Sequence, residues 1–225
     1  KTDNILLPSN GKSPQSILFI QCAGSRDSEH LPYCSSVCCC ISLKQVKYIR
    51  EKNPDARIYI IYKDIRTPGL LEDFYKEEQK DELLFLTKGD IQSIEPADDN
   101  LRIIADNTLM GEKLILNVDL VVLATGMVPA ETTELNLQYR QGKGLPSLKY
   151  QFPDSHFICF PYETRRTGIY AAGTLRAPMD STACEEDAAG AVLKAIQCIE
   201  SVKRGEAVLP RTGDRSFPDL YMDRC

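Results

Sequence analysis

Alternating apolar runs and helical patterns in the first part of the chain constrain its fold more than any other feature. Residues 16–22, 57–62 and 83–86 are short, apolar and β-prone, which is typical of the buried strands of a parallel sheet. Between them, residues 37–52 and 68–80 carry apolar side chains at helical spacing. The order strand, helix, strand, helix, strand predicts a parallel βαβαβ unit with right-handed crossovers.

The middle of the chain changes to a different pattern. Residues 90–95, 101–106 and 113–118 are short β-prone runs separated by turn signals, and they predict an antiparallel β-meander. The sequence DLVVLA then predicts another buried strand, which leads into the sequence ATG. The remaining expected elements are strands at 156–160 and 168–173 and a long helix over 180–202. The expected fold class is therefore α/β.

Composition limits the function classes. The 225 residues are 43% hydrophobic, enough for one large domain or two small ones. The net charge of −5 comes from interspersed acidic and basic residues, which argues against nucleic acid or an anionic membrane surface as a partner. No stretch approaches the roughly 20 apolar residues of a membrane span. The polar N-terminus is no signal peptide, so we expect the nine cysteines in a reducing compartment, where clustered thiols favour metal or redox chemistry.

Two segments in the second half of the chain carry a resemblance. The sequence DLVVLATGMVP, followed later by TGIYAAGTLRAPMDSTACEEDAAGAVLKA, is similar to the thioredoxin-reductase-like flavoproteins, which have two dinucleotide-binding domains. The resemblance implies that the ATG turn returns the chain from the nicotinamide domain to the flavin domain. It also implies that the GIYAAG strand and the next helix form the last part of the FAD pocket. The residues that it places at the flavin are Thr125, Gly126, Gly173, Thr174, Pro178, Met179, Asp180, Ser181 and Thr182.

The expected flavin site is incomplete in this chain. Small residues at a strand end and the N–H groups of a helix start suit a flavin or its phosphates. Most of these enzymes have Gly-Asp at this strand end, whereas here Thr174 follows Gly173, which alters that contact. The ADP half of FAD also needs a GxGxxG turn after a strand, and the sequence has none in that context. We therefore expect the first half of the FAD domain to lie upstream.

Five cysteines cluster between residues 22 and 40, where the second domain of such a flavoprotein would bind NAD(P)H. Gly24 stands alone there, so we reject a nicotinamide site and interpret Asp64 and Arg66 as solvated loop charges. The reducing compartment and backbone strain disfavour a disulfide. Structural zinc is possible but atypical, because the spacing lacks CxxC. An iron–sulfur cluster needs four thiolates, which a strand end, a loop and a helix start can supply.

A second resemblance bears on these cysteines. The pattern FIQCAGSRD, PYCSSVCC and SLKQ resembles the A-type subunit family of heterodisulfide reductase, flavin-based electron-transfer proteins with a thioredoxin-reductase-like core. The resemblance extends over residues 16–209. It implies a 4Fe–4S cluster in place of the nicotinamide, with Cys22, Cys34, Cys38 and Cys39 as its ligands. Cys40 does not match and is interpreted as a small hydrophobic side chain on the helix.

Within that family, the sequence FICFPYETRRTGIYAAGTLRAPMD is most similar to the B-type subunit of the quinone-interacting membrane-bound oxidoreductase complex. This implies a cytoplasmic subunit, peripheral to the membrane through partner subunits, that relays electrons between the quinone pool and adenylylsulfate reductase. One alternative is an NAD(P)H-dependent disulfide reductase, which should show a glycine phosphate turn and a CxxC. Another is a zinc-stabilised docking module without redox activity, which metal analysis would distinguish.

The resemblances and the patterns together predict a domain organisation for a fragment of a longer protein. We expect an N-terminal linker at 1–15, a nicotinamide-domain-like, cluster-bearing domain at 16–125, the C-terminal part of an FAD-binding domain at 126–205, and a tail at 206–225 that leads to a ferredoxin-like domain.

Overall fold

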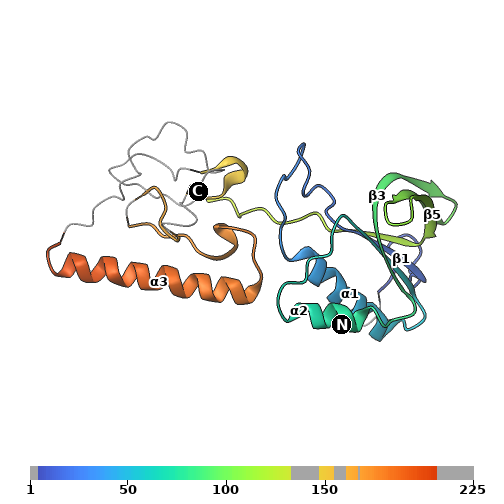
Figure 1. Cartoon of the computed structure of the whole chain (residues 1–225), viewed down its shortest axis with the longest axis horizontal. Helices are drawn as coiled ribbons and strands as arrows, with labels where there is room; N and C mark the ends of the chain where they lie inside the picture. The colour runs from blue at the N-terminus through green and yellow to red at the C-terminus, as the bar shows by residue number, and fades with distance from the viewer. Residues whose placement is uncertain (1–4, 133–146, 155–160, 167, 207–225) are drawn as a thin grey trace. The chain divides into compact units, whose positions relative to one another are not determined.

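The computed structural model describes residues 5–132, 147–154, 161–166 and 168–206 (Figure 1). The chain divides into two compact units, residues 1–126 and 127–225. We refer to them as the N-terminal unit and the C-terminal unit and describe each by itself. No helix within the described ranges combines the length and the apolar character that a bilayer crossing requires.

The N-terminal unit is built around a six-stranded sheet of order β5-β4-β3-β2-β1-β6. Strand β1 pairs in parallel with β2 and β6, and β2 pairs in parallel with β3, whereas β3, β4 and β5 pair antiparallel. The predicted βαβαβ unit and meander are therefore confirmed. The elements in chain order are β1 (Ser16–Ile20), α1 (Cys38–Lys52), β2 (Arg57–Tyr62), α2 (Leu71–Glu78), β3 (Leu84–Ala97), β4 (Asn100–Asn107), β5 (Glu112–Val118) and β6 (Leu120–Leu123).

Strand β3 differs from its prediction, because the expected strands at 83–86 and 90–95 form one continuous strand of 14 residues. Its first part belongs to the parallel sheet and its second part begins the meander. A Cβ at Gly89 would lie 2.5 Å from the carbonyl oxygen of Asp106, so only glycine allows the two backbones to approach this closely. A register shift between Ile91 and Ser93 then bends the strand.

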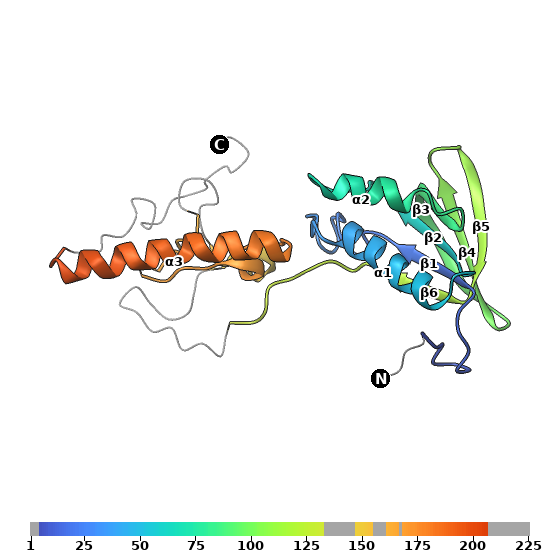
Figure 2. The ribbon, with the colours of Figure 1, turned by 90° about the horizontal axis from the view of Figure 1, so that it is seen from below.

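The core of the N-terminal unit lies on both faces of the parallel strands. Helices α1 and α2 lie on one side of the sheet (Figure 2), where Leu43, Val46 and Ile49 of α1 pack against residues of β1 and β2. The other face packs against Ile103 and Val118 of the meander. Burial on both faces explains why β1 and β2 are continuous apolar runs rather than alternating ones.

The C-terminal unit contains the long helix α3 (Ser181–Lys203), which confirms the predicted helix over 180–202. Asp180 caps it, because its carboxylate accepts a hydrogen bond from the N–H of Ala183 at 2.8 Å. Two short 3-10 turns, η1 (Lys149–Gln151) and η2 (Gly173–Leu175), complete its described elements.

The predicted strand at 168–173 is wrong. Only Tyr170 makes a β-bridge, to Glu163, and Gly173 already belongs to η2. A strand needs a neighbour that satisfies its backbone groups along its length. Among the described residues, 162–164 pair with only the middle of this segment, through Ala171 N–H to the carbonyl of Tyr162 and Thr164 N–H to the carbonyl of Ile169. The predicted strand at 156–160 lies outside the described residues.

Candidate functional site

The loop that joins β1 to α1 brings the four predicted cysteine ligands to one cavity. Cys22 follows the end of β1, Cys34 lies within the loop, and Cys38 and Cys39 stand in the first turn of α1. We name this space the cysteine cavity. Its lining residues are Cys22, Ser25, Arg26, Cys34, Ser35, Ser36, Cys38, Cys39, Asp64 and Arg66. Cys40 does not line it, and its thiol donates to the backbone carbonyl of Arg66 at 3.7 Å.

The cavity occupies the place where an open α/β sheet binds its ligands, outside the carboxyl ends of parallel strands. The loop after β1 and the residues after β2 surround it, and α1 begins there. The first turn of α1 contains no acidic residue. The partial positive charge of this helix N-terminus is therefore available to an anion in the cavity.

The cysteines of the cavity influence one another electrostatically. The pKa of the Cys38 thiol is raised, first by burial and then by the neighbouring Cys34 and Cys22, while a hydrogen bond from the backbone of Gly126 acts in the opposite direction. Burial likewise raises the pKa of Cys39, against a hydrogen bond from the backbone of Arg66. Four thiolates side by side would repel one another, so the cavity holds them in that form only with a compensating cation.

The backbone of the loop is strained at three non-glycine residues. Cys22, Arg26 and Ser36 have φ values of 57°, 53° and 63°, in the left-handed region. Each such residue costs about 1–3 kcal/mol, and residues of this kind cluster at functional sites. Here the strained conformation turns the backbone N–H of Ser36 toward Cys34, whose Sγ accepts its hydrogen bond at 3.3 Å.

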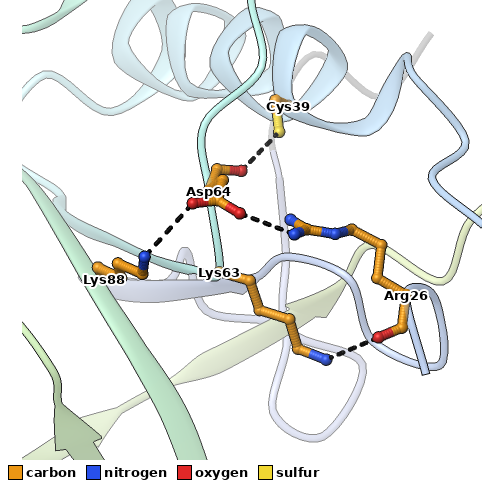
Figure 3. A network of polar contacts seen from close by, with 5 residues as sticks. All are labelled: Arg26, Cys39, Lys63, Asp64 and Lys88. Atoms are coloured by element: carbon orange, nitrogen blue, oxygen red, sulfur yellow. Dashed lines mark hydrogen bonds and ion pairs between the residues drawn. The ribbon is translucent and has the colours of Figure 1, made fainter. Parts of the chain in front are cut away.

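A network of hydrogen bonds and ion pairs centred on Asp64 includes three residues that line the cavity, Arg26, Cys39 and Asp64 itself (Figure 3). The carboxylate of Asp64, which follows β2, accepts from Arg26 Nη2 at 2.7 Å and from Lys88 Nζ at 3.4 Å. The backbone carbonyl of Asp64 accepts from Cys39 Sγ at 3.8 Å. Asp64 is a solvated loop charge as predicted, with its side chain 48% exposed, but it also joins the loop after β1, the end of β2, strand β3 and the start of α1. Its position directly after a buried strand was the sequence signal for this role.

Arg26 is a functional candidate that the sequence interpretation left without a role, although it stands in the GSRD sequence that carries the resemblance. Its pKa is raised, chiefly by the hydrogen bond to Asp64, with a smaller contribution from Cys22. Among the described residues, its Nη1 atom is buried without a hydrogen-bond partner. Such an atom is costly to leave unpaired, so it is complementary to an acceptor or an anion in the cavity.

The donor set of the cavity suits an anionic, thiolate-bound group rather than a single ion. Among the described residues, no three His, Cys, Asp or Glu side chains are grouped as they would be around one metal ion. A 4Fe–4S cluster requires a different ligand arrangement, because each thiolate binds a different iron and the four sulfurs need not converge on one point. Four cysteine thiols, the start of α1 and the buried Nη1 of Arg26 fit that group.

The residues predicted for the flavin fall into two places. Thr125 and Gly126 belong to the N-terminal unit and lie beside the cysteine loop, where Ser25 Oγ donates to the carbonyl of Thr125 at 3.0 Å. Gly126 has φ 98°, and a Cβ there would lie 2.2 Å from Ser25 Oγ and 2.8 Å from Ser35 Oγ. The other predicted flavin residues stand in the C-terminal unit, before and at the start of α3: Gly173, Thr174, Pro178, Met179, Asp180, Ser181 and Thr182.

The segment before α3 is held to that helix by a buried ion pair, which the sequence interpretation missed. Asp187 on α3 pairs with Arg176, and its carboxylate also accepts from the backbone N–H of Gly173 at 2.7 Å. Asp187 lies on the same helix face as Ala191, and both are buried. A charged residue on the buried face of a helix was the signal that could have identified it.

The fold is that of the thioredoxin-reductase-like proteins. The structure resembles thioredoxin reductase of Lactococcus lactis, with a TM-score of 0.52 at 16% sequence identity, over 83% of this chain and 54% of that one. This likeness agrees with the predicted fold class, a mixed α/β fold with a parallel and antiparallel sheet.

The sequence is homologous to a segment of the A-type subunits of heterodisulfide reductases, although no family model matches the chain. It is 37% identical over 180 residues to the second iron-sulfur A-type subunit of CoB–CoM heterodisulfide reductase from Methanopyrus kandleri, over 78% of this chain and 27% of that protein. It is 36% identical over 195 residues to the A-type subunit of the H(2):CoB-CoM heterodisulfide,ferredoxin reductase of Methanothermobacter marburgensis, over 85% of this chain and 29% of that protein. These relatives are oxidoreductases, and the chain spans less than a third of their length.

Proposed function

We propose that the cysteine cavity holds a 4Fe–4S cluster through Cys22, Cys34, Cys38 and Cys39, within the electron-transfer segment of a flavin-dependent oxidoreductase subunit. The observation that carries this proposal is the convergence of these four thiols on one cavity, from a strand end, a loop and a helix start. The name of the Methanopyrus kandleri relative, an iron-sulfur subunit, supports it.

When bound, such a cluster takes up and gives back one electron at a time. The chain's own part is to hold that group and to set its surroundings. The four cysteines bind as thiolates, and the N–H of Ser36 donates to the sulfur of Cys34. The N-terminus of α1 directs its partial positive charge at the same place. Hydrogen bonds to the sulfurs and nearby charges are the means by which a protein tunes such a site.

We propose that FAD contacts the residues before and at the start of α3, where Thr174 stands in place of the usual acid. The carboxylate of Asp187 does not replace that acid, because Arg176 and the N–H of Gly173 already occupy it. The chain lacks a GxGxxG turn after a strand for the ADP half. We expect the purified chain to bind FAD weakly in a fluorescence titration, and tight one-to-one binding would contradict this.

We further propose that the chain is part of the B-type subunit of a quinone-interacting membrane-bound oxidoreductase complex. In that role it would relay electrons between the quinone pool and adenylylsulfate reductase, on the cytoplasmic side and attached to the membrane through partner subunits. The resemblance of residues 157–180 supports this assignment, and the naming of the relatives as subunits of reductases supports a multi-subunit complex. Affinity purification of the full-length protein from its source should recover adenylylsulfate reductase; its absence at low salt would contradict the assignment.

Anaerobic purification of the chain with metal and sulfide analysis tests the cluster. We expect about four iron and four acid-labile sulfide per chain, with a brown colour. Cys34→Ser or Cys39→Ser should abolish both. Cys40→Ser is the matched control, since Cys40 adjoins Cys39 on α1 but does not line the cavity. Zinc without sulfide would instead support a docking module, and full iron in Cys39→Ser would refute the ligand set.

A further inference from the structure

We infer that Arg26 is a positioning residue of the cysteine cavity, whose fixed positive charge compensates the thiolate-bound group and raises its reduction potential. The inference rests on the proposed cluster and deepens it. It assigns a role to a residue that provides no ligand atom. The observations that carry it are the way Arg26 is held, the unpaired atom that it directs into buried space, and the balance of charge around it.

Arg26 is held in place at its backbone and at its side chain. Its backbone N–H donates to the carbonyl of Tyr33 at 3.1 Å, and its own carbonyl accepts from Lys63 Nζ at 3.3 Å (Figure 3). These bonds maintain a left-handed backbone, φ 53°, that a non-glycine residue adopts only when its surroundings require it. Nη2 is bound to Asp64 at 2.7 Å. The guanidinium therefore has little freedom to move when a group in the cavity arrives or changes its charge.

The second step concerns Nη1 of Arg26, the terminal guanidinium nitrogen that does not bind Asp64. Arg26 lines the same cavity as the four cysteines, and its Nη1 is buried without a partner among the described residues. The Arg26 side chain is 24% exposed, yet its Nη1 does not reach water while Nη2 is bound to Asp64. A buried N–H donor beside thiols that act as ligands is suited to a sulfur acceptor or to a nearby negative charge.

The third step is the charge balance of the network. Asp64 would neutralise Arg26 if the two formed an isolated pair, but the second carboxylate oxygen of Asp64 is 3.4 Å from Lys88 Nζ. Arg26, Lys88 and Asp64 together leave one net positive charge beside the cavity, and Lys63 and the cavity-lining Arg66 add to it. A group bound by four thiolates becomes more negative on reduction, so a fixed cation stabilises the reduced form more than the oxidised form. Removing that cation should lower the potential.

The test compares three variants of the full chain, purified anaerobically: Arg26→Gln, Arg26→Lys and Arg57→Gln. Arg57 is a matched control, because it is an exposed arginine at the opposite end of β2 from Asp64. Iron and sulfide content are measured first, and they test the proposed cluster by themselves. The midpoint potential is then measured by a spectroscopic redox titration. Thermal unfolding of the cluster-free proteins reports on the fold.

We expect Arg26→Gln to shift the midpoint potential to more negative values, Arg26→Lys to lie between it and the unaltered chain, and Arg57→Gln to have no effect. Loss of the cluster from Arg26→Gln but not from Arg57→Gln, with unaltered unfolding, would support the compensation of charge, and the midpoint potential of Arg26→Lys would then test the effect on the potential. A potential unchanged in Arg26→Gln overturns it, and so does unfolding of the cluster-free Arg26 variants, since Arg26 would then serve the fold. Absence of iron and sulfide from the unaltered chain refutes the proposed cluster instead.

Discussion

Arg176 and Asp187 form a buried ion pair in the C-terminal unit, with side chains 10% and 6% exposed. Arg176 Nε lies 3.1 Å and 3.0 Å from the two carboxylate oxygens, and Arg176 Nη2 also donates to Asp187. The same carboxylate accepts from the N–H of Gly173, and the guanidinium lies 5.4 Å from the centre of the Tyr162 ring. Asp187 thereby ties the segment before α3, including the predicted flavin residue Gly173, to the helix.

Replacing Asp187 with asparagine should destabilise the chain by about 3–5 kcal/mol, because it leaves the Arg176 charge buried without its counterion. Urea unfolding followed by circular dichroism measures the loss. Glu200→Gln is the control: its partner Lys203 is at 2.7 Å, but both side chains are at least half exposed, and exposed pairs contribute at most about 1 kcal/mol. Equal effects of the two substitutions would contradict the structural role of Asp187.

Gly126→Ala should destabilise the N-terminal unit more than a positive φ alone explains. A Cβ there would collide with Ser25 Oγ at 2.2 Å and Ser35 Oγ at 2.8 Å, so these hydroxyls must rotate away, which breaks the bond from Ser25 to Thr125, or the loop that carries them must shift. Gly111→Ala is the matched control, since Gly111 has φ 73° but nothing within 4 Å of the added Cβ. We expect about 1–2 kcal/mol from backbone strain in the control and about 1–3 kcal/mol more at Gly126. Thermal unfolding of both variants decides this.

Cys39 should react slowly with iodoacetamide in the cluster-free protein. Burial raises the pKa of its thiol above the usual value of 9.0, and only the thiolate reacts. Its alkylation rate should therefore still rise with pH above 9.0 in the folded chain. In urea, where burial is lost, the rate should level off near that pH. Peptide mass spectrometry after timed quenching gives the rate for each cysteine, and a plateau below pH 9.0 in the folded chain would contradict the prediction.

Acid should weaken the fold partly through Asp64. Hydrogen bonds from Arg26 and then Lys88 lower the pKa of its carboxyl below the usual 3.8. A group whose folded pKa is depressed contributes stability above its unfolded pKa, and that contribution is lost as the pH falls through the folded value. The unfolding temperature of Asp64→Asn should therefore fall less between pH 5 and pH 2 than that of the unaltered chain. Asp55→Asn, at an exposed aspartate before β2, should keep the original slope.

Much of the N-terminal unit could be predicted because its signals are local. The continuous apolar run of β2 marked both of its ends correctly, and the helical spacing of α1 placed that helix to within one residue. The strand predicted at 168–173 failed for the opposite reason. Its composition is β-prone, but a strand exists only where another strand satisfies its backbone, and residue composition does not report that neighbour.

The sequence by itself determined the order of helices and most strands in the N-terminal unit, and its resemblance to a known family singled out four cysteines as a set. Only the tertiary structure decided that these thiols line one cavity, and that Arg26 and Asp64, 38 residues apart, meet beside it. It also decided that Thr125 and Gly126 lie against the cysteine loop. The physical reason is that parallel pairing brings the carboxyl ends of β1, β2 and β6 to one edge of the sheet, whereas helical and strand periodicity specify each element without its neighbours.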